Sequence, residues 1–165
     1  MNTNMSPVDW AKRPLEKYAE FSGRAPRAEY WWYTLAIVIL AIIISIIENI
    51  AGLTGMVGPY GPLTALLMLG TFVPTLAVTV RRLHDTDRSA WWLLLIVPYF
   101  VAAAIAVASM KSQSLAGIGS AGLLMILGLI GAVALLVFMI LAGTPNGNRF
   151  GPSAYEAAGD AVPAE

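Results

Sequence analysis

The amino-acid sequence predicts an all-α membrane protein with four transmembrane helices and a short N-terminal helix in the headgroup region. Composition is the first reason, because 58% of the 165 residues are hydrophobic and only 12% are charged, whereas a soluble domain carries roughly 25% charged residues. The second reason is that apolar runs long enough to cross about 30 Å of hydrocarbon recur along the chain. The third is the unequal distribution of lysine and arginine among the segments between these runs.

The predicted spans cover about residues 31–52, 63–83, 91–110 and 118–141, each close to the roughly 20 residues that a helix needs to cross a bilayer. Paired tryptophans begin the first and third spans and are expected to act as interfacial anchors: Trp31, Trp32, Trp91 and Trp92. Pro74 lies near the middle of the second span, where its missing N–H predicts a kink. Small residues four apart, such as Gly128 and Ala132, predict that the third and fourth spans pack closely on each other or on a second copy.

The segments outside the spans are expected to differ from the membrane domain. We predict a flexible N-terminus at 1–13, a single four-span domain at 14–152 and a disordered tail at 153–165. A short helix is expected to begin at Pro14, since proline suits the first helical turn and Leu15 and Tyr18 then share one face. This helix is predicted to lie in the headgroup region or, alternatively, to pack on the cytoplasmic loops.

Ionisable residues are scarce inside the predicted spans. Glu48 lies near the far end of the first span, so we expect its carboxylate to reach water or headgroups rather than to form a buried proton site. The span centres hold only small polar residues such as Ser45 and Thr71, which disfavours an ion or proton carrier.

The positions of the basic residues predict the orientation of the chain. Nine of the ten lysines and arginines lie before the first span, between the second and third spans, or after the fourth. Only Lys111 lies on the other side. Because positively charged segments stay on the cytoplasmic side, both termini and the central loop are predicted to face the cytoplasm.

The loop between the second and third spans holds the only histidine and most of the charge near mid-chain. In a purely structural interpretation, Arg81, Arg82 and His84 complement the C-terminal end of one helix dipole. Asp85 and Asp87 then complement the N-terminal end of the next helix. This interpretation gives these five residues a role without a ligand.

Three ordered motifs are more specific than composition. They are Phe-Ser-Gly-Arg-x-x-Arg-x-Glu-Tyr-Trp-Trp at 21–32, a segment beginning Arg-Arg-Leu-His-Asp at 81–92, and Asn-x-Phe-Gly-Pro at 148–152. With them the chain resembles the DUF805 family of small bacterial inner-membrane proteins. The resemblance covers about residues 15–152 and implies a multi-pass protein of the bacterial cytoplasmic (inner) membrane, with no particular activity. Asp87 and Ala90 stand where glycine is usual in the family.

The functional hypothesis is that the three motifs meet in one cytoplasmic cluster that binds anionic lipid headgroups or a protein partner, since arginine suits phosphate oxygens. The candidate residues are Arg24, Arg27, Glu29, Arg81, Arg82, His84, Asp85, Arg88 and Arg149. The alternative is a small transporter or channel subunit that acts as a homo-oligomer.

Other classes of function are disfavoured by what the sequence lacks. There is no nucleophile motif, phosphate loop or second histidine, so we expect neither an enzyme nor a catalytic residue. The chain has no cysteine and few grouped ligands, so no metal or cofactor is expected. The formal net charge of zero gives no general attraction to nucleic acid.

Overall fold

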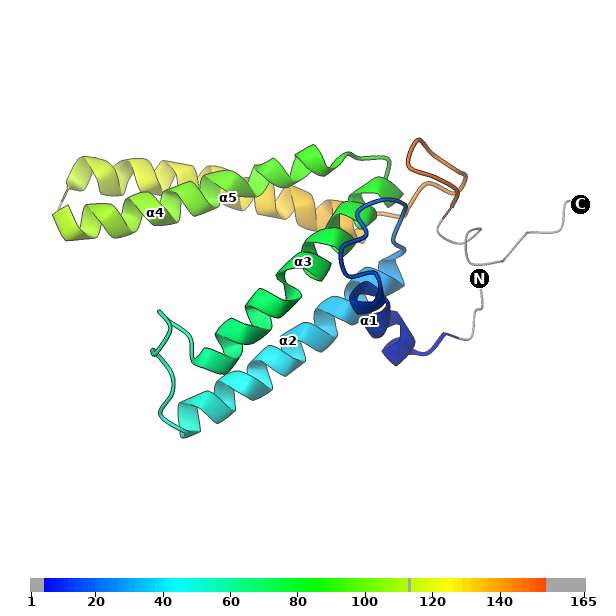
Figure 1. The fold of residues 1–165 in the computed structure, drawn as a ribbon. Helices are drawn as coiled ribbons and strands as arrows, with labels where there is room; N and C mark the ends of the chain where they lie inside the picture. The colour runs from blue at the N-terminus through cyan, green and yellow to red at the C-terminus, as the bar shows by residue number, and fades with distance from the viewer. Residues whose placement is uncertain (1–4, 113, 154–165) are drawn as a thin grey trace, which may run out of the picture. The chain divides into compact units, whose positions relative to one another are not determined.

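A computed structural model describes residues 5–112 and 114–153 of the protein. Within these residues the regular elements are all helical, which confirms the all-α prediction (Figure 1). The chain forms two compact units, one comprising Met1–Asp87 with Gly143–Glu165 and the other Arg88–Ala142. The predicted disordered tail lies outside the described residues except for Ser153.

Helical segments long and apolar enough to cross a membrane occur where the sequence predicts them. The four candidates within the described residues are Arg27–Ile50, Pro62–Asp85, Ala90–Met110 and Leu115–Ile140. They confirm the four predicted spans, with shifted ends. A hydrocarbon environment favours this architecture because a helix satisfies its backbone hydrogen bonds internally.

The first unit contains α1 (Pro7–Glu16), α2 (Arg27–Ile50) and α3 (Pro62–Asp85). Each of these helices packs against the other two. In Figure 1, α1 crosses α2 close to the beginning of α2, and α2 and α3 run in opposite directions.

The N-terminal helix begins at Pro7, so the predicted start at Pro14 was wrong. The reason is a capping box, in which the Ser6 hydroxyl accepts from the Asp9 N–H at 3.2 Å and the Asp9 carboxylate accepts from the Ser6 N–H at 3.0 Å. Pro7 takes the first helical position and Pro14 lies inside the helix. Residues 7–13, which the sequence analysis assigned to a flexible N-terminus, are therefore helical.

The second unit consists of a 3₁₀ helix at Ala90–Ile96 that continues into α4 (Val97–Ser112), followed by α5 (Leu115–Ile140). The change of helix type coincides with Pro98, which has no N–H to donate to the Leu94 carbonyl four residues earlier. The Val97 N–H donates to that carbonyl instead. The backbone group is thereby satisfied without an α-helical bond.

Helices α4 and α5 lie side by side in opposite directions, which confirms the predicted packing of the third and fourth spans (Figure 1). Glycine permits the contact. A Cβ atom on Gly128 would lie 2.6 Å from the Tyr99 nitrogen, and one on Gly131 would lie 2.2 Å from the Leu95 carbonyl oxygen. Small residues thus let the two backbones approach, as in many membrane helix pairs.

Pro74 leaves the Gly70 carbonyl of α3 without its usual helical donor, because a helical N–H bonds four residues back and proline has none. A distant side chain replaces that donor. The Tyr18 hydroxyl, from the turn after α1, donates to the Gly70 carbonyl at 2.7 Å. One turn of the chain outside the spans is thereby fixed to the middle of α3.

Glu48 is buried, contrary to the expectation that it reaches water or headgroups. One carboxylate oxygen accepts from the Thr64 N–H at 3.1 Å, and the other accepts from the Thr64 hydroxyl at 2.6 Å. Gly61 precedes α3 and has no side chain with which to cap it. Glu48 therefore supplies the acceptor and negative charge that a helix N-terminus favours.

We expect Gly131→Ala to lower the free energy of unfolding by roughly 1–3 kcal/mol, the usual cost of overpacking, because its new Cβ would overlap the Leu95 carbonyl. Thermal unfolding in detergent measures this. Gly122→Ala is the matched control, since a Cβ there meets nothing within 4 Å and alanine favours a helix over glycine. Equal losses in the two variants would contradict the packing.

Tyr18→Phe is expected to cost roughly 1–3 kcal/mol, because the Gly70 carbonyl would lose its replacement donor. In a Pro74→Ala background the same change should cost almost nothing, since alanine supplies the missing N–H to the Gly70 carbonyl. A double-mutant cycle of unfolding free energies measures the difference. An equal cost of Tyr18→Phe in both backgrounds would show that the hydroxyl does not replace the proline's donor.

Candidate functional site: a buried arginine and carboxylate cluster

The loop between α1 and α2 lies against the C-terminal end of α3. The Ala25 N–H donates to the Arg81 carbonyl at 3.0 Å, and the Ala25 side chain is buried with Tyr33 and Val78 in one apolar core. Gly23 adopts a φ of +81°, which glycine tolerates better than any other residue. The first sequence motif is thereby brought beside the second.

Glu29 in the first turn of α2 forms the first ion-pair group. Its Oε1 accepts from Arg81 Nη1 of α3 at 2.6 Å, and Arg13 Nε of α1 lies 3.4 Å from its Oε2. The Glu29 side chain is 0% exposed and that of Arg81 is 1% exposed. One buried carboxylate therefore joins the three helices of the first unit.

Asp85, the last residue of α3, forms the second group. Its Oδ1 lies 3.0 Å from both Nε and Nη2 of Arg24, and its Oδ2 pairs with Arg82. Arg24 also donates to the carbonyls of Thr144 at 2.6 Å and Asn146 at 2.8 Å. Arg24 thus holds residues 143–153 against the end of α3.

The third motif contacts His84 on two sides. The Phe150 ring stacks on the imidazole with centroids 3.8 Å apart and planes 4° apart, and the Asn148 amide donates to the His84 carbonyl at 2.8 Å. His84 Nδ1 lies 3.2 Å from the Gly23 carbonyl. Because a carbonyl only accepts hydrogen bonds, Nδ1 must carry the proton.

The three motifs therefore meet, as the composite-cluster hypothesis requires. The candidates in contact between motifs are Arg24, Glu29, Arg81, His84 and Asp85. Arg82 pairs with Asp85 inside the second motif. Arg149 joins at the exposed edge, where its Nε lies 3.3 Å from Asp87 Oδ1. Arg27 is exposed at the beginning of α2. Arg88 belongs to the second unit, where its guanidinium lies 4.1 Å from the Phe138 ring centroid.

The helix-dipole interpretation of the central loop needs correction. Arg81, Arg82 and Asp85 are buried in ion pairs rather than placed at helix ends for their dipoles alone. Asp85 belongs to α3 and does not precede the third span directly. The tryptophans expected as interfacial anchors, Trp31, Trp32, Trp91 and Trp92, are all exposed side chains. Their depth in a membrane stays a prediction.

Arg13 pairs with Glu29, a contact that the sequence did not predict. The predicted N-terminal helix begins at Pro14, one residue after Arg13, and so leaves Arg13 outside it. The capping pair Ser6 and Asp9 is the signal that would have extended the helix.

A small polar cavity of about 170 Å³ lies between the end of α1, the loop before α2 and the third motif. Its charged lining residues are Arg13, Lys17, Arg24 and Glu20. The Lys17 amine donates to the Glu20 carboxylate at 2.9 Å. This hydrogen bond lowers the pKa of Glu20, and the charges of Arg81 and Arg13 act in the same direction. Basic groups therefore dominate the cavity.

Each buried carboxylate of the cluster beside the cavity is shared by two arginines. Glu29 pairs with Arg13 and Arg81, and Asp85 pairs with Arg24 and Arg82. Two buried nitrogens of Arg81, Nε and Nη2, have no hydrogen-bond partner among the described residues, and neither has Glu29 Oε2. A buried donor without a partner is costly, so the two Arg81 nitrogens favour an acceptor nearby. Among the described residues no group of three or more potential ligands is arranged to hold a metal ion.

Comparison with known proteins agrees with the motifs. Residues 18–152 match a family described as "Protein of unknown function (DUF805)". The chain is 35% identical over 146 residues to inner membrane protein YhaH of Escherichia coli strain K12, covering 88% of this chain and 95% of the relative. It is 39% identical over 145 residues to inner membrane protein YhaI of that strain, covering 87% and 93%. No solved structure matches.

Glu29→Gln is expected to lower the free energy of unfolding by roughly 3–5 kcal/mol, because Arg81 would keep a buried charge without its carboxylate. Glu20→Gln removes the same charge from an exposed pair and should cost less than about 1 kcal/mol. Chemical unfolding in mixed micelles compares the two variants. Similar small losses in both would contradict a structural role for the buried pair.

Proposed function

The chain belongs to the DUF805 family. We propose that it is a multi-pass protein of the bacterial inner membrane and that its cytoplasmic face binds an anionic phospholipid headgroup. One observation carries the binding proposal: two buried nitrogens of Arg81 have no hydrogen-bond partner among the described residues, next to a polar cavity lined by Arg13, Lys17 and Arg24. The candidate spans and the names of the two relatives support the location.

Both termini are proposed to face the cytoplasm. The distribution of the basic residues supports this orientation. The contacts of the first unit agree with it, because Arg24, Asp85 and Thr144 can meet only on one side of a membrane. Two candidate spans separate Arg24 from the loop after Asp85, and two more separate that loop from Thr144. An even number of crossings brings these segments to the same side.

The basic residues that line the cavity have different roles. Arg24 is occupied by Asp85 and by backbone carbonyls, so it positions the surrounding loops. Arg13 and Lys17 keep partly exposed side chains and are the groups that would donate to phosphate oxygens. Arg81 lies behind them, and its buried charge also attracts an anion. Salt screens this attraction less than it screens the attraction of a surface charge. A phosphate would thus complement the basic residues around the cavity.

Lys17→Gln is expected to weaken phosphatidylglycerol binding roughly fivefold, since one basic residue near a membrane surface contributes about 1 kcal/mol. Native mass spectrometry of protein released from vesicles of phosphatidylethanolamine and phosphatidylglycerol measures the lipid retained. Arg149→Gln is the matched control, because it removes the same charge from the same unit outside the cavity.

Equal phosphatidylglycerol retention by wild type and Lys17→Gln would overturn the proposal. Loss of retention in Arg149→Gln to the same extent would show that net charge alone attracts the lipid. Co-purification of a stoichiometric acidic protein that excludes the lipid would assign the cavity to a protein partner instead.

A further inference from the structure

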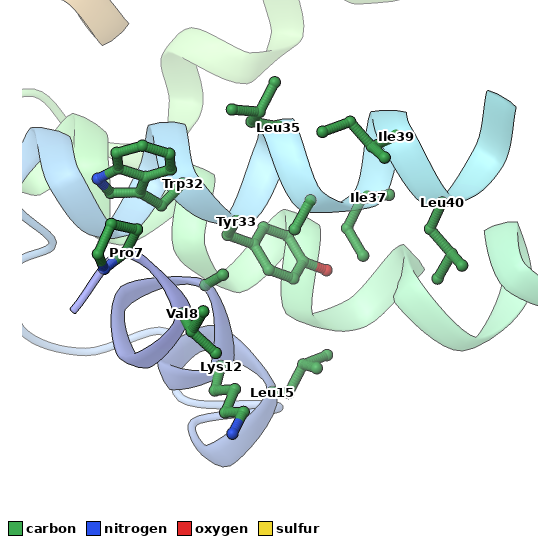
Figure 2. Close-up of a pocket in the computed structure, with 12 residues that line it drawn as sticks. Pro7, Val8, Lys12, Leu15, Trp32, Tyr33, Leu35, Ile37, Ile39 and Leu40 are labelled. Atoms are coloured by element: carbon green, nitrogen blue, oxygen red, sulfur yellow. The ribbon is translucent and has the colours of Figure 1, made fainter. Parts of the chain in front are cut away.

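A second concave site, apolar in character, lies between α1 and the first half of α2. This groove has a volume of about 400 Å³ and shares no lining residue with the polar cavity. In Figure 2, Val8 and Leu15 of α1 lie across the groove from Tyr33, Ile37 and Leu40 of α2.

The groove exists because α1 has apolar residues on more than one face. Trp10 and Pro14 are buried within the unit, whereas Val8 is 58% exposed and Leu15 is 45% exposed. On the opposite wall Leu40, in a candidate membrane span, is 42% exposed. The groove is therefore open along a helix that is apolar and long enough to lie in hydrocarbon. A concave apolar surface gains contact energy when a chain of matching shape fills it.

Lys12 indicates which class of molecule fits the groove. It is the single charged residue that lines the groove, and it forms no hydrogen bond or ion pair with any residue in the described part of the chain. Figure 2 shows its amine directed away from α2, at the outer side of α1. An apolar groove with one cation at its edge complements an amphiphile that has an apolar chain and a negative headgroup.

We propose that this groove holds an acyl chain of an anionic phospholipid, with the phosphate at Lys12. The long lysine side chain can keep its amine at headgroup level while its methylene groups follow the apolar wall. The inference goes beyond the headgroup cavity proposed above, because it rests on other residues and on chain burial. A negative result for the Lys17 variant would therefore overturn the headgroup cavity, and a negative result for the Lys12 variant would overturn the headgroup position proposed for the groove.

The test uses the full chain in phosphatidylethanolamine vesicles with a phosphatidylglycerol probe that carries a photoreactive group in its acyl chain. Val8→Trp fills the groove, and labelling of peptides containing residues 7–16 and 32–40 should then fall roughly tenfold, the change that about 1.4 kcal/mol produces. Ile43→Trp is the control, because Ile43 is exposed on α2 and does not line the groove. Leu40→Trp repeats the test from the other wall.

Lys12→Gln should keep the chain labelling in the groove but remove the preference for the phosphatidylglycerol probe over a phosphatidylethanolamine probe with the same chain. Labelling that is unchanged by both Val8→Trp and Leu40→Trp would overturn the proposal, since the lipid would then be ordinary surrounding bilayer. Cross-links between the α1 helices of two chains, with no lipid label, would assign the groove to a second copy instead.

Discussion

Two buried carboxylates, Glu29 and Asp85, hold the first unit together. Each faces two guanidiniums, and these come from α1, α3 and the loop before α2. Four arginines so close together would repel one another without the carboxylates. Removing one partner of a buried pair leaves an uncompensated charge, which costs far more than losing an exposed pair. The meeting of the three sequence motifs therefore depends on these two side chains.

The same unit also shows how apolar spans satisfy backbone groups that a regular helix leaves without partners. Tyr18 donates to the Gly70 carbonyl, to which Pro74 has no N–H to donate. Glu48 accepts from the first N–H groups of α3. In hydrocarbon an unsatisfied backbone group costs several kcal/mol, because no water can replace the missing partner. These two side chains fix segments outside α3 to its middle and to its beginning.

The unsatisfied donors of Arg81 connect this architecture to the proposed function. Two of its buried nitrogens have no hydrogen-bond partner among the described residues, and the nearby polar cavity is lined by Arg13 and Lys17. We propose that an anion in this cavity compensates these positive charges. The groove beside Lys12 shares no lining residue with the cavity, so the two proposed lipid contacts need not involve the same lipid.

The spans could be predicted from the sequence because length and apolarity alone determine whether a helix can cross hydrocarbon. The meeting of the three motifs also followed from their positions relative to an even number of spans. The hydrogen-bond and ion-pair partners of the buried residues could not be predicted in this way. Glu48 and Thr64 lie 16 residues apart across a loop. Arg13 pairs with Glu29 from α1, a helix that includes Arg13 because the Ser6 capping box starts it at Pro7. Such contacts depend on tertiary geometry that no local pattern records.

The dependence of the first unit on the buried Glu29–Arg81 pair is tested most directly by a double-mutant cycle, measured as free energies of unfolding in mixed micelles. Glu29→Gln and Arg81→Gln are each expected to be strongly destabilising, and the double variant is expected to recover much of the loss, because two neutral side chains leave no unpaired charge at this buried pair. Additive losses would contradict this dependence, since the two residues would then contribute independently.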